Sequence, residues 1–191
     1  ASSATAYAYL YANANGDLTV TGDVLVSAYA EQNAPTNGSS SVYAYAYADL
    51  YAASNITVNG NVTVTATAIN NIETLDDSSA SAFAYLYATA DTGDITVNGN
   101  ILVTAYVEQT AASASNSGNA SSYASADLDA GDDIDLNGNV TVTATAINNM
   151  YAPSESSNAS GSATAYAYLY ATAGGDLTIA GNTLVTADAT F

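Results

Sequence analysis

The chain has 191 residues, of which 49% are hydrophobic, but it contains no Lys, Arg, His, Cys or Trp. Its 18 Asp and Glu residues therefore have no cationic side chain to pair with, and the formal net charge is −18. Apart from carboxylates, the side chains that act as general bases, activate a nucleophilic Ser or hold phosphate are missing, so the composition argues against an enzyme.

The absence of cations also limits the partners. Nucleic acids are bound through Lys and Arg, and anionic membranes attract basic segments, so neither is an expected partner. Membrane insertion is not expected either, because apolar residues alternate with polar ones and never run for about 20 positions. The remaining partners are further copies of this chain and neutral glycans of a host or matrix.

The first predicted element is a β-strand within Ser3–Ala12. Ala and Leu alternate there with Thr and Tyr, which is the period of a strand with one buried face. A second motif, (Asp/Asn)-(Leu/Ile)-Thr-Val-x-Gly-(Asp/Asn), follows at Asp17–Asp23. The first unit then ends with Ala28–Gln32. A helix would scatter these alternating faces around its circumference, so we expect almost no helix.

The same order of motifs recurs along the whole chain, which predicts one repetitive β domain over residues 1–191. The glycines of the second motif are 38, 39, 39 and 43 residues apart. We expect these to be the repeat-turn glycines: Gly22, Gly60, Gly99, Gly138 and Gly181. Each Tyr/Ala segment ends on a leucine: Leu10, Leu50, Leu86, Leu128 and Leu169. The five units span approximately residues 3–40, 41–80, 81–121, 122–161 and 162–191.

The sequences of successive units alternate between two types, so the full repeat is a pair of units. The first and third end in Ala-Tyr-(Ala/Val)-Glu-Gln, whereas the second and fourth end in Thr-Ala-Thr-Ala-Ile-Asn-Asn. Length varies at one phase only, in segments rich in Ser, Asn, Gly and Pro, which favour turns and loops. We therefore expect loops in four connectors: Asn33–Ser41, Glu73–Ser81, Thr110–Ser122 and Ala152–Ser162.

Two architectures fit this pattern. In the favoured one, about five units of 39 residues form a β-solenoid (β-helix), with the Ile, Val, Leu and Ala positions of Ile56–Ala68 facing a thin core. In the alternative, the Asn-Gly pairs at Asn59, Asn98 and Asn137 form tight hairpins. Antiparallel hairpins would then build a pilin-like β-sandwich whose subunits join by strand complementation.

The segment Asn55–Ala68, Asn-Ile-Thr-Val-Asn-Gly-Asn-Val-Thr-Val-Thr-Ala-Thr-Ala, resembles the long β-helical repeats of filamentous-haemagglutinin-type bacterial surface adhesins. The resemblance covers nearly the whole chain as a style of repeat. It implies a secreted right-handed β-helix used for adhesion and surface display. The chain departs from that family in being far richer in Tyr and in showing no amino-terminal secretion domain.

The candidate functional residues are tyrosines that share one face of the predicted strands. Stacked strands would align them in aromatic ladders, which cover the protein's own surface or form contacts between subunits. The predicted assembly residues are Tyr7, Tyr9, Tyr11, Tyr43, Tyr45, Tyr47, Tyr85, Tyr87, Tyr166, Tyr168 and Tyr170.

No cofactor and no catalytic residue is predicted. An acidic cluster is the one feature that could bind a cation, because calcium takes several carboxylate and carbonyl oxygens. It comprises Asp127, Asp129, Asp132, Asp133 and Asp135. These residues lack the spacing of a known calcium loop, so a solvated acidic turn is the competing interpretation.

The expected function is that of a structural subunit or segment of an extracellular or cell-surface filament that assembles through β-edges and tyrosine ladders. The alternative is an adhesin stalk or a carbohydrate-binding module that does not polymerise. The chain begins at Ala1 without Met or a signal peptide, which is typical of a matured secreted protein or of a piece of a longer one.

Overall fold

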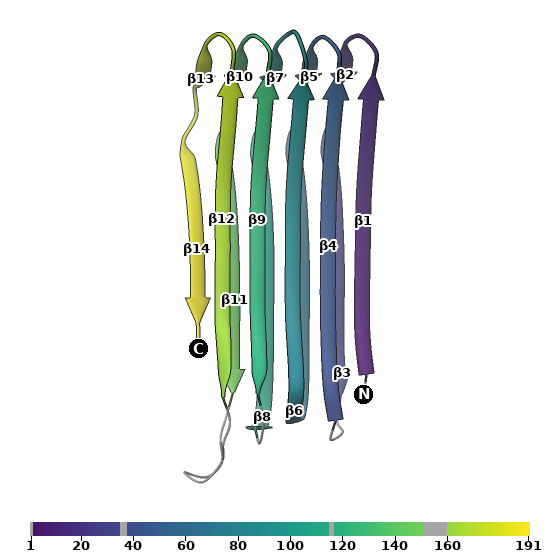
Figure 1. The fold of residues 1–191 in the computed structure, drawn as a ribbon, viewed down its shortest axis with the longest axis vertical. Helices are drawn as coiled ribbons and strands as arrows, with labels where there is room; N and C mark the ends of the chain where they lie inside the picture. The colour runs from purple at the N-terminus through teal and green to yellow at the C-terminus, as the bar shows by residue number, and fades with distance from the viewer. Residues whose placement is uncertain (1, 35–37, 115–116, 151–159) are drawn as a thin grey trace.

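A computed structural model of the chain describes residues 2–34, 38–114, 117–150 and 160–191. These residues form fourteen β-strands and no helix, and every strand pairing among them is parallel. The strands wind into a β-solenoid of about four turns (Figure 1). The predicted all-β solenoid is therefore confirmed. Within the described residues there is no helix of the length and apolarity needed to cross a membrane.

The first unit shows the path that the other units repeat. β1 (Ser2–Ala14) is a long strand, β2 (Leu18–Val20) is a short strand, and β3 (Val24–Ala34) is a long strand that runs back. The chain bends at residues 15–17 and 21–23, where Asn, Gly and Asp favour turns. We call the end with these bends the corner end and the opposite end the loop end.

The remaining strands follow the same order. In the second and third units they are β4 (Gly38–Ala52), β5 (Ile56–Val58), β6 (Val62–Ala90), β7 (Ile95–Val97) and β8 (Ile101–Ala114). In the fourth and fifth units they are β9 (Gly118–Ala130), β10 (Ile134–Leu136), β11 (Val140–Met150), β12 (Gly161–Ala173), β13 (Leu177–Ile179) and β14 (Thr183–Thr190).

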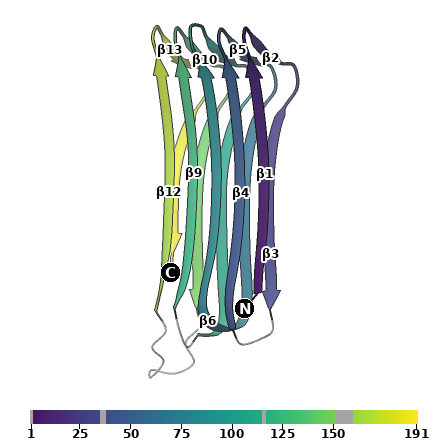
Figure 2. The same ribbon diagram turned by 45° about the vertical axis from the view of Figure 1, so that its right-hand side comes forward.

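The long strands form two layers that face each other (Figure 2). The tyrosine layer contains β1, β4, the second part of β6, β9 and β12, and the threonine layer contains β3, the first part of β6, β8, β11 and β14. Because β6 belongs to both layers, they count as one nine-stranded sheet. The short strands form a separate five-stranded sheet in the order β13-β10-β7-β5-β2 at the corner end.

The core between the layers is thin because its centre is lined by alanine. Ala44, Ala46 and Ala48 of β4 are fully buried, and so are Ala82 and Ala84 of β6. Toward the corner end larger side chains such as Leu50 and Ile56 fill the space. The alternation predicted for Ile56–Ala68 is confirmed, because every apolar position of β5 and of the first part of β6 in this range is buried.

The Asn-Gly pairs form solenoid corners, so the hairpins of the alternative architecture are not present. Asn59 and Gly60 connect β5 to β6, but β5 pairs with β2 and β7 instead of with β6. Gly60 is needed because adjacent corners stack closely. A Cβ added at Gly99 would lie 2.4 Å from the Gly60 carbonyl oxygen, and the same clash recurs at Gly138 and Gly181.

The connectors are shorter than composition predicts. Glu73–Ser81, expected as a loop, lies entirely within β6, and Ser40 and Ser41 belong to β4. Ser and Asn remain in the strands here because parallel neighbours on both sides pair with them, as Ser79 pairs with Ser41 and Asn119. Most of the expected loop at Thr110–Ser122 lies in β8 and β9, and its residues 115 and 116 lie outside the described residues. Most of Ala152–Ser162 lies outside the described residues.

Candidate functional site

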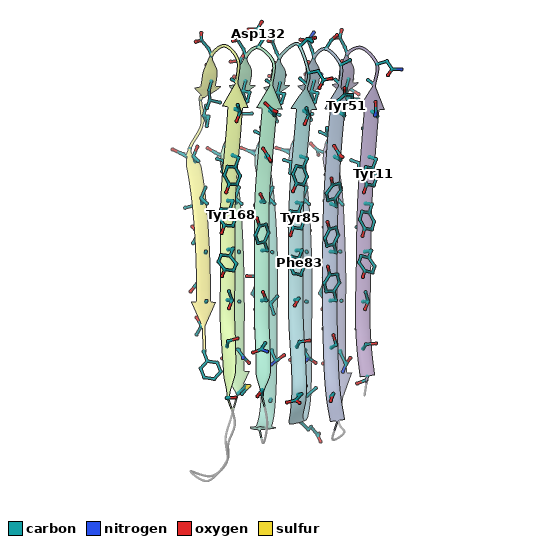
Figure 3. The ribbon with its side chains drawn as sticks, viewed as in Figure 1. Tyr11, Tyr51, Phe83, Tyr85, Asp132 and Tyr168 are labelled. Atoms are coloured by element: carbon teal, nitrogen blue, oxygen red, sulfur yellow. The ribbon has the colours of Figure 1, made fainter. Side chains whose placement is uncertain are left out.

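The tyrosines of the Tyr/Ala segments project from the outer face of the tyrosine layer, because strand alternation turns the intervening alanines into the core. Figure 3 shows Tyr11, Tyr85 and Tyr168 on this face, on strands of the first, third and fifth units. The parallel register arranges the outward residues in rows that cross all five units. The first row is aromatic throughout: Tyr7, Tyr45, Phe83, Tyr123 and Tyr166.

Two further rows run beside the first and are interrupted. The second row consists of Tyr9, Tyr47, Tyr85, Ser125 and Tyr168. The third alternates between tyrosine and aspartate: Tyr11, Asp49, Tyr87, Asp127 and Tyr170. All the predicted assembly tyrosines except Tyr43 lie in these three rows. Tyr43 lies beside the first row, in register with Thr5 and Ser81.

Sequence reasoning missed two members of the aromatic face, Phe83 and Tyr123. Both are an even number of residues from outward-facing positions of their own strand, so the strand alternation in the sequence could have identified them. Tyr123 matters most, because among the described residues it is the aromatic ring that connects β6 to β12 across β9.

The rings pack in a herringbone arrangement. Neighbouring rings on one strand are nearly parallel, with interplanar angles of 8–17° and centroids 5.9–6.4 Å apart. Rings on adjacent strands are tilted by 36–52°. These separations fall in the range where aromatic pairs add about 0.5–1.5 kcal/mol beyond the area they bury.

The closest rings are diagonal neighbours instead of residues in direct register. The ring centroid of Tyr9 lies 5.5 Å from that of Tyr45, whereas it lies 6.3 Å from that of its register partner Tyr47. The direction of the diagonal reverses from one strand to the next, so the closest contacts form a zigzag across all five units. The zigzag is Tyr9, Tyr45, Tyr85, Tyr123 and Tyr168, with successive centroids 5.5, 5.5, 5.2 and 5.4 Å apart.

Packing of the rings against one another raises the pKa of their hydroxyl groups. Burial among neighbouring rings raises the pKa of Tyr47 to about 12, with a smaller contribution from the Asp49 carboxylate. Burial also raises the pKa of Tyr85 well above its ordinary value. These phenols therefore keep their protons to a higher pH than a free tyrosine does. In the outermost units the rings are covered on one side only, and Tyr11 is 67% exposed.

Without cations, carboxylates in this chain accept hydrogen bonds from neutral donors. Tyr106 donates to Glu108 at 2.8 Å on the threonine layer, and Tyr51 donates to Asp91 on the tyrosine side. Burial, followed by the hydrogen bond to Glu108, raises the pKa of Tyr106 to about 12. At the corner end the acceptors take backbone N–H groups instead, which gives the stack a direction.

Two directional ladders of hydrogen bonds run along the corners. In the first, the Oδ1 atom of each Asp or Asn accepts the backbone N–H of the next unit. The bonds run from Asn55 N to Asp17, Asp94 N to Asn55, Asp133 N to Asp94 and Asp176 N to Asp133, at 3.1, 2.9, 3.1 and 2.7 Å. In the second, they run from Asn61 N to Asp23, Asn100 N to Asn61, Asn139 N to Asn100 and Asn182 N to Asn139, at 2.6, 2.9, 2.9 and 2.8 Å.

The ladders end in complementary groups. In the first unit, the backbone N–H groups of Asp17 and Asp23 have no acceptor among the described residues. In the fifth unit, the Oδ1 atoms of Asp176 and Asn182 have no donor within the described part of the chain. The edges of β1 and β3 at one end, and of β12 and β14 at the other, are likewise unpaired.

A buried polar column near the loop end was not predicted. Ser40 donates to Asn70 Oδ1 at 2.9 Å, Asn70 Nδ2 to Gln109 Oε1 at 3.5 Å, and Gln109 Nε2 to Asn148 Oδ1 at 3.3 Å. Asn148 Nδ2 then reaches the Gly118 carbonyl at 2.7 Å. The sequence could have indicated it, because Gln109 follows Ala105 and Val107 at intervals of two residues and so belongs to the core-facing side of the strand. The column fixes register, because a slip would leave its amides unpaired in the core.

The predicted acidic cluster is only partly assembled. The carboxylates of Asp132 and Asp133 lie with that of Asp94, from the neighbouring unit, within 4.8 Å of one another. Figure 3 shows Asp132 at the corner end. Asp127 and Asp129 lie instead on β9, and Asp135 lies on β10. Three carboxylates could supply part of the six to eight oxygens that calcium takes.

Together these features define the class of the protein: a β-solenoid repeat protein with tyrosine-rich aromatic ladders. No protein-family model, curated protein sequence or solved structure matches the chain.

Proposed function

We propose that the chain is a non-catalytic structural subunit or segment of an extracellular or cell-surface filament, in which solenoids join end to end through their open β-edges. The observation that carries this proposal is the complementarity of the two ends. Each end offers the hydrogen-bonding groups that the other end needs, in the arrangement already used between units inside the chain.

A second copy placed on the fifth unit continues both corner ladders. Its Asp17 N–H would donate to Asp176 Oδ1, and its Asp23 N–H would donate to Asn182 Oδ1. Because the ladders are directional, only head-to-tail stacking satisfies these groups. Head-to-tail contacts that do not close into a ring generate open filaments. The β1 edge is suited to such pairing, since Ser2–Ala14 has no charged residue and no Pro to block it.

The aromatic face supports the same arrangement. Ser162–Ala171 has the same sequence as Ser3–Ala12, so the tyrosines of the first and fifth units occupy equivalent positions. In a head-to-tail stack the exposed ring of Tyr170 would lie near that of Tyr11 in the next copy. The three rows would then continue from one copy to the next and would bury rings that are half-exposed in the single chain.

Charge opposes this assembly. Each chain carries −18, and repulsion between exposed carboxylates is screened by salt, with a Debye length of about 8 Å at physiological ionic strength. We therefore expect filaments to form more readily as the salt concentration rises. Expected partners are copies of the same chain, and nucleic acid is not among them.

The style of repeat also supports an extracellular role. It resembles that of filamentous-haemagglutinin-type surface adhesins, and the β-solenoid agrees with the fold which that resemblance implies. The second candidate function is an adhesin stalk or carbohydrate-binding surface that does not polymerise. The observation that favours it is the exposure of Tyr7, Tyr9 and Tyr11 along β1, where their rings could contact neutral glycans.

Gly22 provides a sharp test of end-to-end joining. A Cβ at Gly22 has no atom within 4 Å in the single chain, whereas in the stack it would meet the Gly181 corner of the preceding copy, as Gly60 meets Gly22. Electron microscopy of the wild-type chain at rising salt should show filaments. Gly22→Ala should give short discrete rods with an unchanged circular dichroism spectrum.

Tyr106→Phe serves as the matched control, because it removes one hydroxyl from an inner unit and leaves both ends intact. It should form filaments like the wild type. Wild-type chains that stay discrete at every salt concentration would overturn the filament proposal and favour the second candidate. Filaments of Gly22→Ala equal to those of the wild type would show that the open edges are not the joint.

A further inference from the structure

The zigzag of close ring contacts that crosses all five units consists of tyrosines only. It runs through Tyr9, Tyr45, Tyr85, Tyr123 and Tyr168, and it bypasses Phe83 although that ring lies in the same array. Each step joins two adjacent units with centroids 5.2–5.5 Å apart. Packing alone would be served equally well by phenylalanine. A continuous series of phenols in contact can in addition be oxidised and can couple from ring to ring.

We propose that the aromatic face is a site of oxidative cross-linking, in which tyrosines of neighbouring units couple to dityrosine along this zigzag. The co-reactant is a peroxide, used by a haem peroxidase that removes one hydrogen atom from each phenol. The two phenoxyl radicals form one carbon–carbon bond between ring positions ortho to the hydroxyls. The hydrogen on each coupling carbon then moves to oxygen, which restores two phenols. In sum, two tyrosines and one hydrogen peroxide give one dityrosine and two waters.

Three features favour this reaction on this face. The radical has its unpaired electron density at ring carbons, and the rings of adjacent units are close enough for those carbons to meet without unfolding. Competing oxidation is scarce, because the chain has 16 Tyr, one Met and no Cys or Trp. An oxidant can reach the rows at their ends, where Tyr9 is 52% exposed and Tyr170 is 53% exposed.

The inference concerns contacts within one chain, so it stands or falls independently of end-to-end assembly. Each cross-link along the zigzag would connect two adjacent units covalently. A chain that has no Cys, and so no disulfides, would thereby gain permanent bonds between its repeats.

The test treats dilute, discrete chains with hydrogen peroxide and horseradish peroxidase and measures dityrosine fluorescence and mass. A protease that cleaves at aspartate then separates the strands, because Asp17, Asp49, Asp91 and Asp127 lie between successive members of the zigzag. We expect linked peptides to join only consecutive units, with the loss of two hydrogen atoms per link. Unfolding the chain in urea before oxidation should abolish this selectivity.

Tyr123→Phe is the decisive variant. The ring array already accommodates Phe83, 5.5 Å from Tyr43, so the fold should persist, which circular dichroism would verify. Links from the third to the fourth unit and from the fourth to the fifth should disappear, while the Tyr9–Tyr45 link remains. Tyr106→Phe is the matched control and should leave every link in place, since no described ring pairs with Tyr106.

Two results would overturn the proposal. One is a folded chain that forms no dityrosine under conditions in which the urea-unfolded chain does. The other is indiscriminate coupling, in which Tyr29 or Tyr106 on the threonine layer is found in links as often as Tyr85 and Tyr123.

Discussion

Leu86 lies in register with Ala48 on the neighbouring strand, and Leu50 lies in register with Ala88. The leucines that end the Tyr/Ala segments are therefore staggered by two residues from one unit to the next. Leu128 is likewise in register with Ala88. Large and small side chains thus alternate along each column of the core. Inside the chain this interdigitation gives a physical reason why the sequence repeats in pairs of units. At the proposed joint between copies it is not kept, because Leu10 and Leu169 belong to the same column.

The stagger predicts that Ala48→Leu is destabilising. The new side chain would stand directly between Leu10 and Leu86, in a fully buried position that now holds a methyl group. Overpacking of this kind typically costs about 1–3 kcal/mol. The free energy of unfolding should fall by that amount in urea titrations followed by circular dichroism.

Thr89→Leu is the control for this substitution. Thr89 belongs to the same layer but faces outward, so the larger side chain has space and the free energy of unfolding should change little. An equal loss of stability in both variants would show that the alternation of leucine and alanine has no role in packing.

Much of this architecture was accessible from the sequence because strand alternation and repeat spacing both act locally. Ile56, Val58 and Val62 are buried as their parity predicts, and this parity continues unbroken through Gly60. The choice between hairpin and corner was harder. Asn-Gly suits both, and only the pairing of β5 with β2 and β7 separates them.

The rest depended on register, which composition does not encode. The positions of Tyr9 and Tyr47 in one row, and the diagonal contact between Tyr9 and Tyr45, follow from how neighbouring strands align. Ser-rich Glu73–Ser81 resembled a loop because Ser and Asp favour turns, but parallel partners on both sides hold it in β6. Tertiary pairing overrode local preference there.

The glycine column predicts opposite outcomes for one substitution at two equivalent positions. Gly99→Ala would place a Cβ 2.4 Å from the Gly60 carbonyl oxygen, and backbone on both sides limits relaxation. We expect it to lower the free energy of unfolding by about 1–3 kcal/mol or more. Gly22→Ala, with open space around the added Cβ, should leave the midpoint of urea unfolding unchanged in discrete chains. A similar loss at both sites would mean that backbone flexibility, and not close stacking, makes these residues glycine.

Two buried serines make a second matched pair. The Ser122 hydroxyl is fully buried and has no hydrogen-bond partner among the described residues, and Ser122 lies in register with Ala82 and Ala165. An unsatisfied buried hydroxyl costs about 1–3 kcal/mol, so Ser122→Ala should raise the thermal midpoint. Ser40→Ala should lower it, because the Ser40 hydroxyl accepts from Gln32 Nε2 at 2.5 Å and donates to Asn70. The prediction fails if both substitutions shift the midpoint in the same direction.

Alkaline pH should destabilise the fold through the partly buried phenols. In the unfolded chain tyrosine loses its proton near pH 10, whereas in the folded protein burial holds the pKa of Tyr47 and of Tyr106 at about 12. Between these values the folded state binds more protons than the unfolded state, so stability is full below about pH 10 and falls as pH rises toward about 12. Urea midpoints across this range should decrease, and the part of the tyrosinate absorbance that comes from Tyr47 and Tyr106 should develop at higher pH in the folded chain than in the unfolded chain.

The double variant Tyr47→Phe with Tyr106→Phe removes both of these phenols and keeps their rings. It should lose less stability than the wild type over the same range of pH, while its stability near neutral pH changes little, because neither hydroxyl is needed to fill the core. An equally steep alkaline loss in the double variant would instead assign the effect to general repulsion in a chain that already carries −18.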